Sequence, residues 1–154
     1  MSTAQFDVRP IQERLRTGVP QLRSVQGAAD YAAVTALRDF PAPCAYVVLA
    51  KERGAQNPPG NAIRGQVMPV SQVVEVVFGV VLVVRNYREQ RGAQVVDELG
   101  VLLAAVRNQL LGFVPDVIGA RACQLVQGDL LDYDGAVALW AESYTTQHMI
   151  RSTP

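Results

Sequence analysis

The sequence predicts an α+β fold: a mixed, largely antiparallel β-sheet with about three helices packed on it. Three observations support this class. The chain has 49% hydrophobic and 18% charged residues, a composition typical of a chain that buries a core. Segments with helical spacing occur among valine-rich segments that alternate. An Asp-Gly pair joins the last two alternating segments, which is typical of a hairpin turn. At 154 residues we expect a single domain over residues 1–154.

The first third of the chain is expected to hold two helices and a short strand. Residues 7–19 place Ile11, Leu15 and Val19 on one stripe, and Asp7 is positioned to cap the first turn. A short edge strand over 22–25 follows. A second helix is expected over 28–39, ended by the prolines at 41 and 43.

Two strands separated by a long loop are expected in the middle. Residues 44–50 are apolar throughout, as in a strand covered on both faces. Residues 51–66 are rich in Gly, Asn and Pro and carry almost no apolar side chains, so we expect a mobile loop there. Residues 67–85 alternate, which predicts a long strand with a bulge or bend at Gly79. Its valine-rich centre is too short and too β-branched for a membrane-spanning helix.

The last third is expected to be one helix and a hairpin. A polar connection over 86–92 leads to a helix over 93–112, which Gly112 and Pro115 end. Its buried stripe comprises Val95, Leu99, Leu102, Val106 and Leu110. Strands over 120–132 and 136–150 then flank the turn at residues 133–135. On the second strand, one face carries Val137, Leu139 and Ala141, and the other carries Trp140, Glu142 and Tyr144.

The residue types that build catalytic sites are scarce. His148 is the single histidine, and no carboxylates flank it at the spacing of a metal site, so a structural or solvent-facing role is expected. Cys44 and Cys123 lie in apolar stretches and form no C-x-x-C pair. We therefore expect two buried, inert thiols. These observations favour a protein that is not an enzyme and has no catalytic residues.

Two patterns that resemble ligand loops also fail on inspection. Asp129, Asp132 and Asp134 cluster at the last turn, but their spacing does not match an EF-hand, which needs ligands at positions 1, 3, 5 and 12. The glycines between 54 and 65 lack the order of a phosphate-binding loop. We expect no cofactor and no bound metal. A formal net charge of zero gives no reason to expect direct recognition of nucleic acid or of a membrane.

Arginine dominates the basic residues, because Lys51 is the single lysine among 14 basic side chains. Two groups stand out: Lys51, Arg53 and Arg64 around the long loop, and Arg85, Arg88 and Arg91 in the next connection. Ordinary solvated loops explain them as well as a protein-binding surface does, where arginine is favoured over lysine. Both interpretations stay open from the residues alone.

Several stretches of this sequence resemble the small tail terminator proteins of long-tailed, siphovirus-type bacteriophages. The resemblance spans nearly the whole chain and is one of layout, with no single diagnostic motif. It rests on residues 6–15 (Phe-Asp-Val-Arg-Pro-Ile-Gln-Glu-Arg-Leu), 22–31, 45–52 and the Asn-Pro loop, 78–88 (Phe-Gly-Val-Val-Leu-Val-Val-Arg-Asn-Tyr-Arg), 97–99, 131–135, Trp140 and 142–144.

The resemblance implies a structural virion protein with a helix-flanked sheet. Family members assemble as a ring, typically a hexamer, on the head-proximal end of the tail tube. The ring stops tube polymerisation and presents a surface for head joining. The partners so implied are further copies of the chain, the tail tube protein and a head–tail connector or neck protein. The implied location is the neck region of the virion tail, with assembly in the host cytoplasm.

An assembly role leads to expectations about interfaces. We expect Arg53, Arg64, Arg85 and Arg88 at contacts between subunits or with the tube, so that glutamate at positions 85 and 88 blocks assembly without unfolding the monomer. We also expect an exposed edge of the 67–85 strand to pair with a neighbouring copy.

Other functions remain open at this stage. A head–tail connector or stopper protein would share the size, the neutral charge and the lack of catalytic residues. A thiol-dependent enzyme using Cys44 or Cys123, and a small-molecule-binding module, are alternatives from different classes.

Overall fold

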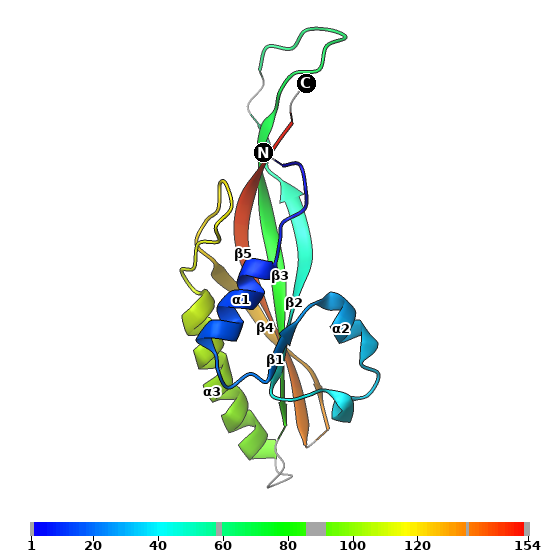
Figure 1. Ribbon diagram of the computed structural model, residues 1–154, viewed down its shortest axis with the longest axis vertical. Coiled ribbons are helices and arrows are strands. Elements are labelled where there is room, and N and C mark those ends of the chain that lie inside the picture. The colour runs from blue at the N-terminus through cyan, green and yellow to red at the C-terminus, as the bar shows by residue number, and fades with distance from the viewer. Residues whose placement is uncertain (1, 58–59, 86–91, 135, 153–154) are drawn as a thin grey trace.

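The computed structural model describes residues 2–57, 60–85, 92–134 and 136–152, and for residues 92–97 it describes the backbone alone. Within these ranges the chain forms one five-stranded sheet, three α-helices and one short 3₁₀ helix (Figure 1). The order along the chain is α1 (Arg9–Gly18), β1 (Ser24–Gln26), α2 (Ala28–Ala33), η1 (Leu37–Asp39), β2 (Cys44–Gly54), β3 (Ser71–Arg85), α3 (Gly92–Leu110), β4 (Gln124–Tyr133) and β5 (Val137–Arg151). The predicted α+β class is confirmed.

The sheet is mixed, with strand order β1-β2-β3-β5-β4. The short β1 pairs parallel to β2, and every other pairing is antiparallel. β3 lies at the centre and pairs with β5 along its full length, from Ser71 opposite Arg151 to Arg85 opposite Val137. It also pairs with β2 on its other side. The expectation that the 67–85 strand offers an exposed edge is therefore wrong.

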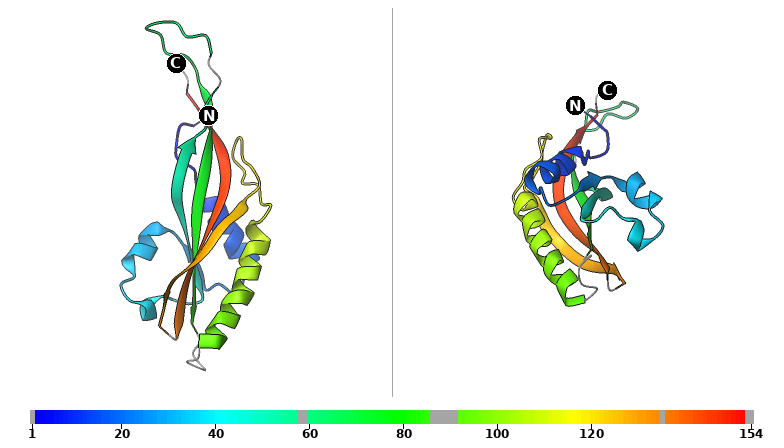
Figure 2. Two further views of the ribbon diagram at one scale, coloured as in Figure 1. Left: turned by 180° about the vertical axis from the view of Figure 1, so that it is seen from behind. Right: turned by 60° about the horizontal axis from the view of Figure 1, so that its bottom comes forward.

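Helices cover the two faces of the sheet unequally. α1 and α3 pack on one face, over a core that includes Ile11, Phe78 and Leu102. The segment of α2 and η1 lies on the opposite face (Figure 2), where Tyr46 and Val83 belong to a second, smaller cluster. That segment covers only one end of this face. At the other end, Val73, Glu75 and Val77 of β3 keep part or all of their exposure.

Most predicted elements are present, with shifted ends. α1 begins at Arg9 instead of residue 7, and the Asp7 carboxylate accepts the Arg9 amide at 2.9 Å, so it acts at the first turn as expected. α3 ends at Leu110, and Gly112 follows with a φ of 81°, a conformation that glycine adopts at helix C-termini. Its described buried residues are the predicted Leu99, Leu102, Val106 and Leu110.

The predicted helix over 28–39 is wrong in its second half. α2 stops at Ala33, Val34 is extended at φ −85° and ψ 124°, and a separate 3₁₀ turn follows at η1. The β-branched pair Val34 and Thr35 disfavours a continuous helix. The break also lets Tyr31, Val34 and Leu37 all pack against the small cluster on this face.

The strands that flank the long loop also differ from expectation. β2 runs to Gly54, so residues 51–54 are strand and not loop. β3 starts at Ser71, two residues after Pro69. The bulge expected at Gly79 is absent from the described ladder, and the irregularity lies in β2 between Leu49 and Lys51. Gly79 instead permits close packing, because a Cβ there would lie 3.2 Å from Val48 Cγ2.

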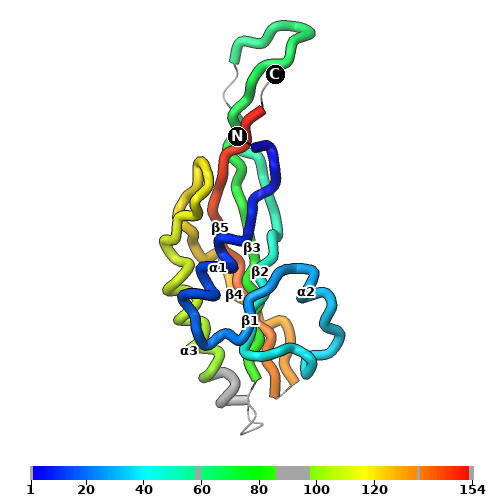
Figure 3. Tube along the Cα trace, in the orientation of Figure 1, coloured from blue at the N-terminus to red at the C-terminus, as the bar shows by residue number. Residues whose placement is uncertain are grey.

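The described part of the β2–β3 loop, residues 55–57 and 60–70, projects beyond the helices at one end of the molecule, next to both termini (Figures 1 and 3). Three backbone contacts join this end: Ala55 N to Val73 O, Ser152 N to Val70 O and Arg151 N to Ser2 O. The loop base is thus held by the sheet and by the C-terminal end of β5.

Candidate functional site

A polar cluster is buried under α3, on the face of the sheet that the helices cover. Glu142 of β5 has no exposed surface. The Arg107 guanidinium donates from Nε to both of its carboxylate oxygens at 3.0 and 3.1 Å, and the Tyr144 hydroxyl donates to Oε1 at 2.9 Å. The Glu142 carboxylate raises the pKa of Arg107, and burial raises the pKa of Tyr144. Every polar end in this cluster is matched, which is the arrangement of a structural network.

His148 belongs to a second structural pair. It is 7% exposed, and its Nε2 lies 3.0 Å from Glu52 Oε1. The same carboxylate oxygen accepts the Phe6 amide at 2.7 Å, and the Phe6 ring meets the imidazole edge-on at 5.6 Å between centroids. His148 and Glu52 therefore attach the N-terminal segment to the sheet. The structural role expected for His148 is confirmed.

Neither cysteine is placed as a nucleophile. Cys44 and Cys123 are free and fully buried, and burial raises the pKa of each thiol to about 11. At pH 7 roughly one thiol in ten thousand is then ionised, and the thiolate is the reactive form. The thiol-dependent mechanism has no chemical support from this geometry.

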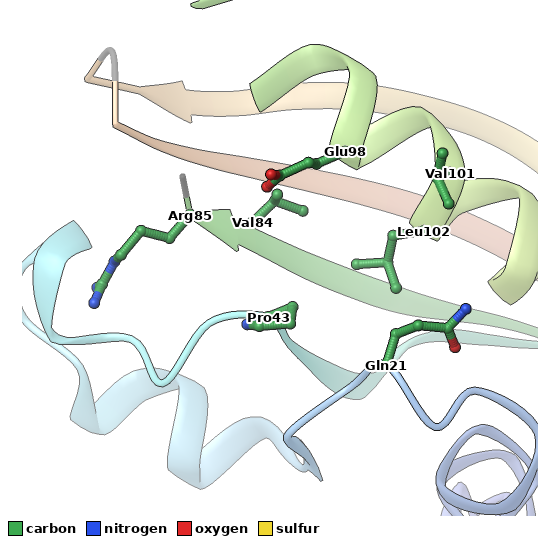
Figure 4. Close-up of a pocket in the computed structure, with 7 residues that line it drawn as sticks. All are labelled: Gln21, Pro43, Val84, Arg85, Glu98, Val101 and Leu102. Carbon is green, nitrogen blue, oxygen red and sulfur yellow. The ribbon is translucent and has the colours of Figure 1, made fainter. Parts of the chain in front are cut away.

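Three open pockets lined by described residues have the size of a small-molecule site, and Figure 4 shows one of them. It measures about 500 Å³ and lies between α3, the end of β3 and the segment before β1. Its lining residues are Gln21, Pro43, Val84, Arg85, Glu98, Val101 and Leu102. Arg85 points away from this space in Figure 4, and its guanidinium donates to the carbonyls of Leu37, Arg38 and Phe40. The described lining offers Gln21 and Glu98 as its other polar side chains, fewer than the converging groups of a typical ligand site.

The remaining features are surfaces that the protein leaves uncovered. β4 is an edge strand whose outer side carries no strand, and it exposes Val126, Leu130, Leu131 and Tyr133 by 39–56%. The projecting loop exposes Ile63, Val67, Met68 and Val70 by 39–73%. Apolar side chains gathered in this way are typical of protein-binding surfaces.

The four arginines predicted at interfaces lie in different environments. Arg53 is exposed near the end of β2, and Arg64 is exposed in the projecting loop. Arg85 is bonded to its own chain, so its replacement also disturbs η1. Arg88 lies outside the described residues. Their interface role stays a prediction.

Comparison with known proteins gives the setting in which these surfaces act. Residues 1–154 match the family model described as "Phage tail terminator protein". The chain belongs to the phage tail terminator family. The resemblance seen in the sequence is confirmed, and membership in this family makes the chain a structural protein of the phage tail and virion.

Two further comparisons accompany the match to the phage tail terminator family. Among solved structures, a chain of the "Virion of native gene transfer agent (GTA) particle" aligns with a TM-score of 0.47 and 14% identity. The alignment covers 89% of this chain and 90% of that chain. A search of curated proteins found no match.

The sequence analysis missed the buried Arg107–Glu142 pair. The alternation of β5 places Glu142 on the same face as Trp140 and Tyr144, and a carboxylate on an aromatic, inward face requires a cationic partner. In the described chain, no group of three or more His, Cys, Asp or Glu side chains is close enough to hold a metal ion. No described helix has the length and apolarity needed to cross a membrane.

Proposed function

We propose that this chain forms a ring, hexameric as is typical of its relatives, on the head-proximal end of the phage tail tube. There it stops tube polymerisation and provides the surface for head joining. The observation that carries the proposal is the match of the whole chain, residues 1–154, to the phage tail terminator family. The partners are further copies of the chain, the tail tube protein and a neck protein on the head, and the chain acts without catalysis.

The geometry of the described residues supports a role based on surface contacts. Two buried ionisable side chains, Glu142 and His148, are committed to structural contacts with Arg107 and Glu52. Among the described residues, eight exposed apolar side chains lie instead on the edge strand β4 and on the projecting loop, and four more lie on α3 and in the segment after it. Such a division of polar and apolar groups suits a protein whose contacts with neighbours complete its packing.

The projecting loop is the part we assign to contacts outside the ring. We propose that this segment, predicted to be mobile from its composition, becomes ordered against the tube or the neck protein. Arg64 would supply charged contacts there, beside the exposed Ile63 and Val67. Segments that order on binding are common in assembly and signalling contacts.

Deletion of the gene from its phage, followed by electron microscopy of the lysate, tests the proposal. Loss of a terminator gives tubes that are overlong and carry no heads, because nothing stops subunit addition. Tails of normal length without heads would contradict termination and favour the connector or stopper role. Complementation with the wild-type gene is the control, and it should restore tail length and infectivity together.

A further inference from the structure

Two edges of the sheet have no strand beside them. The outer side of β4 is one, over Gln124–Tyr133. The other, within the described residues, consists of the outer side of the short β1 and of β2 beyond Tyr46, because β1 pairs only with Cys44–Tyr46 and the rest of β2 has no strand beside it (Figure 1). Unpaired edges expose backbone donors and acceptors that favour strand addition, and natural proteins usually protect them. β4 is long and carries exposed apolar side chains as well as two aspartates and two register shifts.

The two edges are complementary in direction. β2 is antiparallel to β3, β3 to β5, and β5 to β4, so β4 and β2 run in opposite directions within one subunit. A neighbour related by a rotation that keeps strand direction therefore brings its β4 antiparallel to β2, with the faces of the two sheets continuous. Such a contact is head-to-tail, uses two different surfaces, and repeats around a closed ring.

The charges on these edges are also complementary. On β2, Lys51 and Arg53 stand opposite Val77 and Glu75 of β3, so both lie on the face that α2 covers at its other end. On β4, Asp129 and Asp132 stand opposite Ala141 and Leu139. A register shift between Leu130 and Asp132 puts these two aspartates on the same face as neighbours. Because of this bulge, Asp129 and Asp132 are neighbours on one face of β4 although they are three residues apart in the sequence. Their spacing along the strand therefore matches that of Lys51 and Arg53, which are two residues apart on β2.

These four side chains are available for contacts between subunits. Within the described part of the chain, ion pairs form elsewhere, at Asp7, Glu13, Glu142 and Glu52, and none includes these four residues. Gln127 donates to Asp129 at 2.9 Å, and Asp132 accepts the amide of Tyr133. In an antiparallel pairing, Arg53 opposite Asp129 and Lys51 opposite Asp132 form two cross-strand pairs of opposite charge, which stabilise a sheet.

We propose that, in the ring proposed above, β4 of one copy adds to the free edge of β2 in the next copy, with Arg53 facing Asp129 and Lys51 facing Asp132. This inference rests on the proposed function and names the surfaces that join the subunits. β1 sets the register, because it occupies β2 at Cys44–Tyr46 and forces the incoming strand to pair beyond it.

The stagger that results is compatible with closure. Within one subunit, Asp129 of β4 lies in the same cross-strand row as Tyr46 of β2. The row passes through Ala141 of β5 and Val81 of β3. Pairing with Arg53 shifts the neighbour by three same-face rows, roughly 20 Å along the strands. Over the four long strands, spaced by roughly 4.8 Å, this shift gives a strand tilt of about 45°. Closed sheets have strand tilts of about this size.

Cysteine cross-linking in phage particles tests the pairing directly. A deletion phage is complemented with R53C/D129C, and purified particles are analysed on non-reducing gels. The native thiols are buried, so they do not compete. We expect a ladder of covalently linked copies, and monomers only from R53C or D129C alone. Monomers only from R53C/D129C particles that contain the chain, or links only to a different protein, would overturn the pairing.

Charge exchange gives a second measurement that does not depend on cysteine chemistry. The variants K51D/R53D and D129K/D132K should each reduce incorporation into particles by about tenfold or more, because like charges then face each other. The combined variant K51D/R53D/D129K/D132K, in which the charges of the two strands are exchanged, should restore incorporation. Matched controls are R23D and D116K, which alter exposed charges outside β2 and β4. Full incorporation of either reversed variant, or no restoration by the exchange, would contradict the proposal.

These outcomes separate the pairing from the function. Particles with tails of normal length and no cross-link would leave termination intact and remove the β4–β2 pairing. Normal-length tails in the phage that lacks the gene would remove termination whatever the cross-links show.

Discussion

Single buried residues in this chain stabilise the sheet from its core. The edges of the sheet are left free. The clearest case is Glu142, a fully buried carboxylate that faces the α3 side of β5. Arg107 reaches it from α3 with a side chain that is 38% exposed, and Tyr144 completes the set. Burial of a charge is tolerated only when such partners are present, so this network fixes where α3 sits on the sheet.

Removal of Arg107 should therefore destabilise the fold strongly. We expect R107A to lower the free energy of unfolding by about 3 kcal/mol, because an uncompensated carboxylate is left in the core. Urea denaturation followed by circular dichroism measures the change. N108A, at the neighbouring exposed position of α3, is the control and should change stability little.

The double variant R107A/E142Q separates charge from packing. It should recover most of the lost stability, because the neutral amide needs no cationic partner. A double variant that is as unstable as R107A would show that packing of the arginine stem, and not the charge, stabilises this contact.

The buried thiols make stability fall in alkaline solution. Burial raises the pKa of Cys44 and Cys123 to about 11, from an ordinary value of about 9. Between these values the folded chain retains protons that the unfolded chain releases. The stabilising contribution is thus complete below pH 9 and is lost as the pH rises toward 11, by up to about 1.4 kcal/mol per pH unit for each group. Burial also raises the pKa of Tyr46 to about 12, which acts in the same direction.

Denaturation midpoints measured from pH 8 to pH 10.5 test this dependence. The wild-type midpoint should fall with rising pH, and C44A/C123A should show a shallower slope whatever its stability at pH 8. Parallel slopes for the two proteins would contradict the assignment to the thiols.

At the scale of elements, the sequence predicts the regular segments well. It predicts poorly where a helix breaks and which strands lie side by side. The alternation of β3 and β5 and the stripe of α3 follow from side-chain period alone, because each element buries one face. The break between α2 and η1 was not predicted, because helical spacing of Tyr31, Val34 and Leu37 also fits three contacts with one small cluster. Packing against the sheet decides between one continuous helix and two short helical segments.

Strand order was the other property that local pattern did not supply. β3 is the most apolar strand, and it lies at the centre because both of its faces are covered along much of its length. The hairpin strand β4 lies at the edge, and none of its residues is fully buried. Order depends on contacts between distant segments, which no local period records.

None of the described side chains of the projecting loop is buried. Its base is fixed by Ala55 and Val73, while Ile63 and Val67 are 55% and 73% exposed. Replacement of residues 57–70 by a short Gly-Ser turn should leave the melting temperature within a few degrees of wild type, because little core is removed. Incorporation into tails, measured on purified particles, should fall at least tenfold.

Point variants refine this prediction for the loop. I63S/V67S should reproduce the loss of incorporation, whereas L111S/V114S, which changes exposed apolar residues after α3, should not. Normal incorporation of the shortened chain would remove the loop from the assembly surface.

The molecule as a whole is a sheet with one well-covered face, one partly covered face, two free edges and a loop that extends past its helices (Figure 2). In the described chain the two thiols are buried and the histidine is paired with Glu52. Its family membership places these surfaces in a phage tail. We propose that contact through these surfaces stops the tube from growing.

The most direct test is tube elongation with purified components. The tail tube protein is allowed to polymerise, the purified chain is added, and tube length is followed by electron microscopy. We expect elongation to stop and the chain to be found at one end of each tube. Continued elongation at an unchanged rate, with the chain unbound or distributed along the tube walls, would contradict it.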